Sequence, residues 1–235
     1  MRLDRYIAES TDYSRRDAKL FLKKKRVTVD GEVQRSAAFI VPTGAQVVLN
    51  DEVLQLPQPI YLMMHKPKGV VSANVDDVHP TVMSILPSRI AKRAHIVGRL
   101  DQDTTGLLLI TDDGDWTHAI TSPKKHCTKT YRAFLAEEVS DEALEQLRVG
   151  VMLRNEKKLT KPALVSRVSE CEVLLTIEEG RYHQVKRMFA AVKNRVITLH
   201  RESIGGLLLD AQLNPGEWRD LTDRECQLVF ESAAS

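Results

Sequence analysis

The sequence of 235 residues lacks the features of a secreted, zinc-binding or membrane-spanning protein. Its three cysteines (Cys127, Cys171 and Cys226) are scattered and contain no C-x-x-C pair, so they favour neither a disulfide framework nor a zinc site. The longest apolar runs, such as Ile60 to Met64, are far shorter than the ~20 residues of a membrane helix. The N-terminus MRLDRYIAES carries charges where an export signal needs an apolar core. These absences predict a cytoplasmic protein in a reducing compartment, without a membrane partner.

The chain also has little excess charge of either sign, since its formal net charge is only +2. Its bases are nevertheless concentrated in three blocks: residues 14–26 (SRRDAKLFLKKKR), 123–132 (PKKHCTKTYR) and 181–201 (RYHQVKRMFAAVKNRVITLHR). Each block taken alone is explained as well by a solvated helix face. Three such blocks in a charge-balanced protein predict a surface that binds a polyanion.

The pattern predicts two units, a small one over residues 1–57 and a larger one over residues 58–235, which meet at the linker LPQP. In the small unit, Ser14 followed by Asp17 is typical of a capping box at the start of a basic helix. The alternating segment RVTVDGEV turns at Asp30-Gly31 and predicts a β-hairpin. TGAQVVLND predicts a further strand.

The larger unit mixes strands and helices without a regular βαβ rhythm. Strands are expected over residues 60–65, 94–97, 107–111, 129–139, 163–169, 172–179 and 195–202. Helices are expected to begin at Pro80, Gly114, Ser140, Arg181 and Thr222. Long strands with few helices between them predict an α+β fold with a mainly antiparallel sheet.

A close acidic pair, Asp101 and Asp103, lies in the segment GRLDQDTTGLLLIT (98–111). One interpretation is a D-x-D-x-T phosphotransferase motif with a magnesium ion between the carboxylates. That motif follows a buried strand directly, whereas Gly98 and Arg99 interrupt the apolar run here. The other interpretation uses one working acid, with Asp103 as an acceptor of backbone N–H groups.

Several motifs resemble the pseudouridine synthase family. They are HKPKGVVSA (65–73), GRLDQDTTGLLLITDDG (98–114), KTYRA (129–133) and EGRYHQVKRMFAAVKNRVITLHRESIGGLLLD (179–210). Residues 1–51, with YSRRDAKLFLKKKRVTVDGEV and GAQVVLND, resemble the S4-type RNA-binding module. HPT (79–81), TKP (160–162) and HRESIGG (200–206) are similar to the branch of the family that acts on small-subunit (16S) ribosomal RNA.

The resemblance implies an isomerase that converts a uridine in 16S rRNA to pseudouridine during ribosome biogenesis. It implies Asp101 as the catalytic carboxylate, Lys186 as its cationic partner and Tyr131 as the residue that stacks on the detached uracil and helps to remove the C5 proton. Because the product is an isomer of the substrate, no cofactor and no metal are needed. Asp101 either attacks C1′ of the ribose or removes a sugar proton, and both routes stay open.

We expect RNA contacts from a set of exposed bases: Arg2, Arg5, Arg15, Arg16, Lys19, Lys23, Arg26, Arg99, Lys129, Arg181 and Arg187. Arg99 has an alternative, an ion pair with Asp101 or Asp103. His183 and His200 are interpreted as packing or phosphate contacts. The protein is expected to act as a monomer on rRNA, either free or in a partly assembled ribonucleoprotein. The alternatives are a synthase for large-subunit rRNA and a non-catalytic assembly factor on the same fold.

Overall fold

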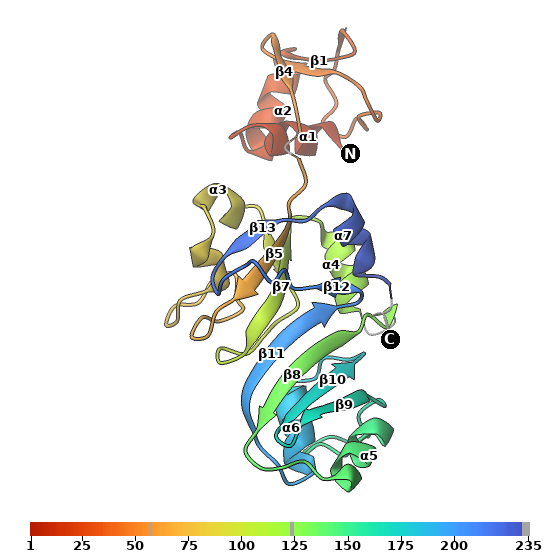
Figure 1. Ribbon diagram of the computed structural model, residues 1–235. Coiled ribbons are helices and arrows are strands. Elements are labelled where there is room, and N and C mark those ends of the chain that lie inside the picture. The colour runs from red at the N-terminus through yellow and green to blue at the C-terminus, as the bar shows by residue number, and fades with distance from the viewer. Residues whose placement is uncertain (57, 123–124, 232–235) are drawn as a thin grey trace. The chain divides into compact units, whose positions relative to one another are not determined.

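The computed structural model describes residues 1–56, 58–122 and 125–231. Residues 123 and 124 of the second basic block lie outside the described residues. The chain forms two compact units, Met1–Gln58 and Pro59–Ser235, which are coloured red to orange and orange to blue in Figure 1. No helix in the described ranges is long and apolar enough to cross a membrane.

The N-terminal unit packs two helices on a small antiparallel sheet. Its elements are α1 (Leu3–Ser10), α2 (Arg15–Lys23), β1 (Val27–Val29), β2 (Glu32–Val33), β3 (Val47–Leu49) and β4 (Glu52–Leu54), with strand order β2-β1-β3-β4. The capping box expected at Ser14 and Asp17 is present. Asp30 and Gly31 both have positive φ, which is the geometry of the tight hairpin turn expected there.

The C-terminal unit is built on one long mixed sheet. The strands are β5 (Tyr61–Lys66), β6 (His95–Val97), β7 (Thr105–Thr111), β8 (Lys129–Leu135), β9 (Leu164–Ser169), β10 (Glu172–Ile177), β11 (Val196–Ile204), β12 (Leu207–Leu208) and β13 (Trp218–Asp220). The main order is β13-β5-β7-β11-β8-β10-β9. All of these pairs are antiparallel except β7 with β11, so the sheet is mainly antiparallel, as the sequence predicts.

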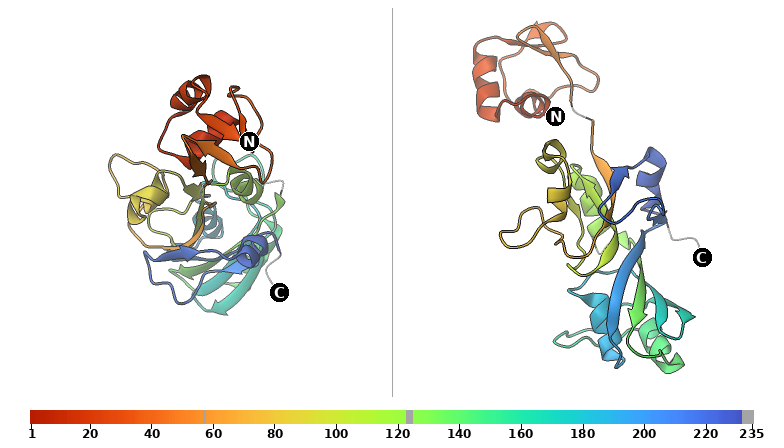
Figure 2. Two further views of the ribbon diagram at one scale, coloured as in Figure 1. Left: turned by 90° about the horizontal axis from the view of Figure 1, so that it is seen from above. Right: turned by 60° about the vertical axis from the view of Figure 1, so that its left-hand side comes forward.

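Helices flank this sheet at its two ends: η1 (Val82–Ile85, a 3-10 helix), α3 (Ser88–Ala91), α4 (Gly114–Thr121), α5 (Asp141–Val149), α6 (Gln184–Ala191) and α7 (Asp223–Leu228). The caps expected at Ser140 and Thr222 are present. The helix expected from Pro80 is wrong in form, since only the short 3-10 turn follows the cap Thr81. Figure 2 (right) shows the long strands β8 and β11 side by side, with α6 beside them.

The parallel pairing of β7 with β11 brings Asp101 close to β11. Asp101 lies just before β7, and the first residues of β7 pair with the middle of β11. This pairing requires glycine at position 106. Gly106 has φ +109°, and a Cβ there would lie 2.3 Å from the carbonyl oxygen of Arg201. Strand β7 itself is buried along most of its length, which explains its unbroken run of leucine and isoleucine.

Candidate active site

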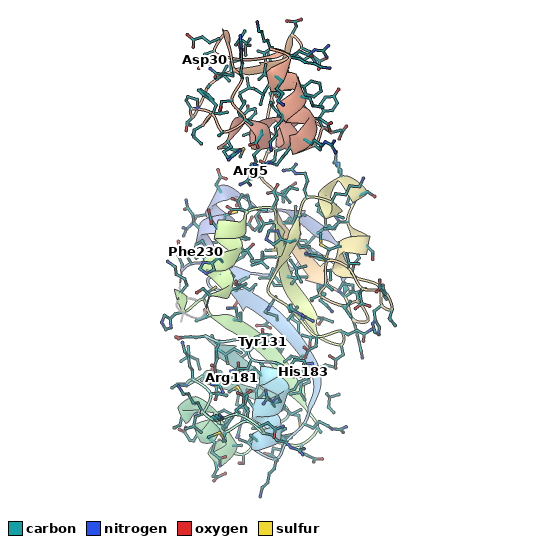
Figure 3. All side chains as sticks on the ribbon, turned by 180° about the vertical axis from the view of Figure 1, so that it is seen from behind. Arg5, Asp30, Tyr131, Arg181, His183 and Phe230 are labelled. Atoms are coloured by element: carbon teal, nitrogen blue, oxygen red, sulfur yellow. The ribbon has the colours of Figure 1, made fainter. Side chains whose placement is uncertain are left out.

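A cleft of about 620 Å³ opens in the C-terminal unit where the loop before β7, the start of β8, the turn before α6 and the middle of β11 meet. The loop contributes Arg99 and Asp101, and β8 contributes Lys129 and Tyr131. The segment that leads into α6, with the helix itself, contributes Glu178, Glu179, Arg181, Tyr182, His183 and Lys186, and β11 contributes Arg201. Figure 3 shows Tyr131, Arg181 and His183 gathered in one region of this unit.

One lysine binds both acids of the close pair, Asp101 and Asp103. Lys186 Nζ lies 3.0 Å from Asp101 Oδ2 and 2.6 Å from Asp103 Oδ1. His183 Nε2 lies 3.4 Å from the other oxygen of Asp101. The structure thus contains the Asp101–Lys186 pairing that the resemblance implied, across a large separation in the chain. The carboxylate of Asp103 binds Lys186 and its side chain is 60% exposed, while a backbone hydrogen bond also helps to lower its pKa. Its expected role as an acceptor of backbone N–H groups therefore stays a prediction.

The charges of this cluster stabilise each other. Burial opposes the charge of Lys186, but hydrogen bonds to Asp103 and Asp101 outweigh it and raise the pKa of Lys186. Partial desolvation is the largest single effect and favours the neutral form of Asp103. The hydrogen bond and the charge of Lys186, with a backbone hydrogen bond and the charge of His183, together outweigh it and lower the pKa of Asp103. A metal ion between the two carboxylates would therefore have to displace an ammonium group already bonded to both.

A second lysine, which the sequence analysis did not single out, holds the loop that carries Asp101. Lys66 at the end of β5 is fully buried, and its Nζ donates to the carbonyl oxygens of Thr104 (2.9 Å), Pro67 (3.0 Å) and Gln102 (3.4 Å). Burial lowers the pKa of Lys66 to about 8, although the nearby carboxylates of Asp103 and Asp101 act in the opposite direction. The only sequence signal was its place in the HKPKG motif.

Tyr131 lies against a buried arginine that was also missed. Tyr131 and Arg201 are directly opposite on β8 and β11, and Arg201 Nη1 lies 3.4 Å from the tyrosine hydroxyl. Arg201 Nε donates to the carbonyl of Leu107 at 2.8 Å, while its Nη2 has no partner among the described residues. Arg201 therefore holds the phenol in the cleft, and its buried Nη2 amino group is left without a partner among the described residues.

Two of the expected RNA-binding residues, Arg99 and Lys129, line the same cleft. Arg99 is exposed and forms no ion pair with the described residues, so the alternative of a bond to Asp101 or Asp103 is not what the structure shows. Lys129 Nζ donates to the carbonyl of Cys127 at 2.7 Å. Desolvation lowers the pKa of Lys129. An RNA contact by either residue stays a prediction.

A third expected RNA-binding residue, Arg181, also lines the cleft, and Arg187 follows on α6. Protein groups already bind the guanidinium groups of both residues. Arg181 donates to the carbonyls of Lys158 and Leu159, and Arg187 donates to Glu156 and to the carbonyl of Tyr182. Both arginines thereby hold the turn before α6 against residues 154–159. Their role in RNA binding stays a prediction, and it would have to use the donors that these bonds leave free.

The remaining expected contacts are in the N-terminal unit, where all seven bases are exposed: Arg2, Arg5, Arg15, Arg16, Lys19, Lys23 and Arg26. Arg2 and Arg15 both bind Asp4, which is almost fully buried. These bonds from Arg2 and Arg15 lower the pKa of Asp4 against the opposing effect of desolvation. The bases on and after α2 other than Arg15 form no salt bridge within the described part of the chain, and they remain available to phosphates.

Comparison with known proteins defines the class of this fold and cleft. A family model described as RNA pseudouridylate synthase matches residues 60–191, and an S4 domain model matches residues 1–47. The chain belongs to the RNA pseudouridylate synthase family and is an isomerase. This result confirms the resemblance and the enzyme class predicted from the sequence.

Full-length relatives are similar as well. The protein named ribosomal small subunit pseudouridine synthase A from Escherichia coli (strain K12) is 51% identical over 97% of this chain and 100% of its own length. Its namesake from Vibrio cholerae serotype O1 is 48% identical over 98% of this chain and 100% of its own length. A crystal structure of a pseudouridylate synthase has a TM-score of 0.71 and 43% identity, covering 97% of this chain and 99% of that one.

Proposed function

We propose that this protein isomerises one uridine to pseudouridine in small-subunit (16S) ribosomal RNA, with Asp101 as the single catalytic carboxylate. The observation that carries the proposal is the position of Asp101 in the cleft, between Lys186 and His183. The names of its full-length relatives support small-subunit RNA as the substrate.

The proposed reaction breaks the C1′–N1 bond of the uridine and forms a C1′–C5 bond. Asp101 acts on the ribose, either by attacking C1′ with a carboxylate oxygen or by removing a sugar proton, and the released uracil turns to present C5. After the new bond forms, the proton at C5 must leave and N1 must gain one, so atoms and charge balance without a cofactor. The ammonium group of Lys186, 3.0 Å from Asp101, is the cation next to the reacting carboxylate.

Tyr131 is proposed to act on the base rather than on the sugar. Its ring lies in the cleft against Arg201, where it can stack on the detached uracil. Its hydroxyl can help to take the C5 proton. The target uridine must leave its helix or loop to reach this pocket, as in other enzymes that act on extruded nucleotides.

The two aspartates provide a matched test. Wild type, Asp101→Asn and Asp103→Asn are incubated with uridine-labelled 16S RNA that has been folded beforehand, and pseudouridine is scored over time. We expect Asp101→Asn to lose at least ~1000-fold in rate, because an amide can neither attack C1′ nor remove a sugar proton, and Asp103→Asn to lose less than ~10-fold. Full activity of Asp101→Asn, or no product with wild type, would contradict the proposal.

The same product assay separates the remaining substrate choices. Mapping pseudouridine in 16S and 23S RNA from one reaction distinguishes a small-subunit from a large-subunit enzyme. Running it on free RNA and on a partly assembled small-subunit particle shows which form the protein modifies, and gel filtration of the protein tests the expected monomer. Product only in 23S RNA would refute the proposed substrate while leaving the chemistry of Asp101 intact.

A further inference from the structure

An exposed aromatic side chain stands at the mouth of the cleft. Tyr182 is 77% exposed, yet it lines the same cleft as Asp101. Its ring stacks on that of His183, with centroids 3.8 Å apart and an interplanar angle of 20°. His183 in turn contacts Asp101 through Nε2. The stack therefore reaches from open solvent to the catalytic carboxylate.

The backbone that carries this stack is held firmly. His183 has φ 47° and ψ 36°, a left-handed conformation that non-glycine residues seldom adopt. Arg187 Nη1 donates to the carbonyl of Tyr182 at 3.0 Å and to Glu156 at 3.1 Å, and the Arg187 amide donates to the carbonyl of His183. Such strained and braced positions are typical of functional sites. These bonds hold the backbone of Tyr182, and the stack on His183 orients its ring although most of its surface faces water.

A fixed, solvent-exposed aromatic ring suits one class of ligand in an RNA-modifying enzyme, an unpaired base. Single-stranded RNA is bound by stacking its bases on aromatic side chains, and this contact tolerates any base because every base has a π face. Extruding the target uridine also leaves its neighbouring base without a stacking partner. Arg99, exposed on the loop of Asp101, lies along the same cleft, where it can receive a phosphate.

We propose that Tyr182, supported by His183, is a stacking platform for the nucleotide adjacent to the target uridine. The platform replaces the stacking that this nucleotide loses when the uridine is extruded. Through the His183 ring it also sets where the RNA lies relative to Asp101. Arg187 is a positioning residue for the platform, because it holds the carbonyl of Tyr182. The inference rests on the proposed function, since it assigns a subsite of the same cleft.

The test measures binding separately from turnover. The probe is an 11-nucleotide single-stranded oligouridylate with 2-aminopurine at its centre, whose fluorescence is quenched when it stacks. We expect wild type to bind and quench the probe. Tyr182→Ala should raise the Kd about 5- to 100-fold and lose the quenching, because one stacked base is removed. Tyr182→Phe should restore both, since stacking uses the ring and not the hydroxyl.

Leu164→Ala is the matched control, because Leu164 is similarly exposed (75%) but lies on β9, away from the residues that line the cleft. It should leave Kd and quenching at the wild-type values. A Kd for Tyr182→Ala within twofold of wild type, quenching that survives the substitution, or no binding of the probe by wild type would each overturn the platform.

The two proposals fail in different ways. Wild type that binds and quenches the probe but makes no pseudouridine in 16S RNA refutes the proposed function and leaves the platform standing. Wild type that makes pseudouridine while Tyr182→Ala has an unchanged KM for 16S RNA refutes the platform and leaves the function standing. The expected result is a higher KM for Tyr182→Ala, in contrast to the loss of kcat expected for Asp101→Asn.

Discussion

Replacing Lys66 by methionine should reduce the activity of this enzyme strongly and its stability only slightly. Lys66 is fully buried, and its ammonium group binds three carbonyl oxygens around the loop that holds Asp101. Methionine fills a similar volume and cannot donate a hydrogen bond. The loop would then lose the hydrogen bonds that hold Asp101 at its position in the cleft.

The effect on stability combines two opposing contributions. Burial holds the pKa of Lys66 at about 8 against a usual 10.5, and the difference corresponds to an unfavourable contribution of about 3 kcal/mol at neutral pH that methionine removes. The two shorter hydrogen bonds, at 2.9 and 3.0 Å, contribute roughly 1.5 to 3 kcal/mol each because the donor is charged. We therefore expect Lys66→Met to lower the free energy of unfolding by only about 0 to 3 kcal/mol.

The activity of Lys66→Met should be affected much more strongly than its stability. A displacement of about 1 Å at a reacting group can cost ~100-fold in rate. A loss of 0 to 3 kcal/mol leaves most domains folded, since typical stabilities are about 5 to 15 kcal/mol. Single-turnover formation of pseudouridine should therefore fall at least ~100-fold for Lys66→Met, while circular dichroism at the assay temperature shows a folded protein. Lys68→Met, at an exposed lysine two residues after Lys66, is the control and should remain fully active.

A pH titration gives an independent signature of the buried ammonium. The folded pKa of Lys66 lies below its unfolded value, so the unfolded state binds more protons between about pH 8 and 10.5, and stability rises with pH in that window. Relative to Lys66→Met, wild type should gain about 1.5 kcal/mol of unfolding free energy between pH 8 and 9.5. Parallel curves for the two proteins, or a fully active Lys66→Met, would refute this account of the loop.

Three further predictions concern the other contacts. Lys186→Met should reduce kcat about 100-fold or more with little change in KM, because Asp101 and Asp103 lose their shared cation; unchanged kcat in a steady-state assay would contradict this. Gly106→Ala should lower the free energy of unfolding by about 3 kcal/mol or more, measured in urea, because its Cβ would overlap the Arg201 backbone. Neutralising Arg16, Lys19 and Lys23 should flatten the dependence of log K on log salt by about 2, measured by RNA binding in a salt series; Arg15 is left unchanged because it binds the buried Asp4.

Local signals in the sequence were sufficient for much of the fold. The turn at Asp30-Gly31 and the caps at Ser14, Ser140 and Thr222 depend on side chains that bond to their own neighbourhood, and each is present. The long strands follow from runs of apolar and β-branched residues. The short strands β12 and β13 were missed because two or three residues carry no periodicity, and the helix expected from Pro80 became a 3-10 turn.

The sequence predicted only those site residues that lie in the motifs of the family resemblance. Asp101, Lys186 and Tyr131 came from motifs, and the structure brings all three to one cleft, although their chemical roles stay predictions. Lys66 and Arg201 could not be found from local pattern, since each acts through backbone carbonyls supplied by a distant strand or loop. A lysine in a strand looks like a surface residue until the tertiary fold buries it.

The two acids and their shared lysine form a charged cluster that can orient the RNA backbone in the cleft. Asp101, Asp103 and Lys186 together carry a net charge of −1. Four cations, Arg99, Lys129, Arg181 and Arg201, line the same cleft, and its two further acids, Glu178 and Glu179, are paired with Lys161 and Arg181. A phosphate is repelled by the acidic cluster and attracted to these cations, whereas a neutral ribose is not repelled. Of the two acids, Asp101 is the less exposed, at 27% against 60%. We expect this arrangement to turn the RNA backbone away from Asp101 and the sugar towards it, so that the cleft selects the atom on which the carboxylate acts.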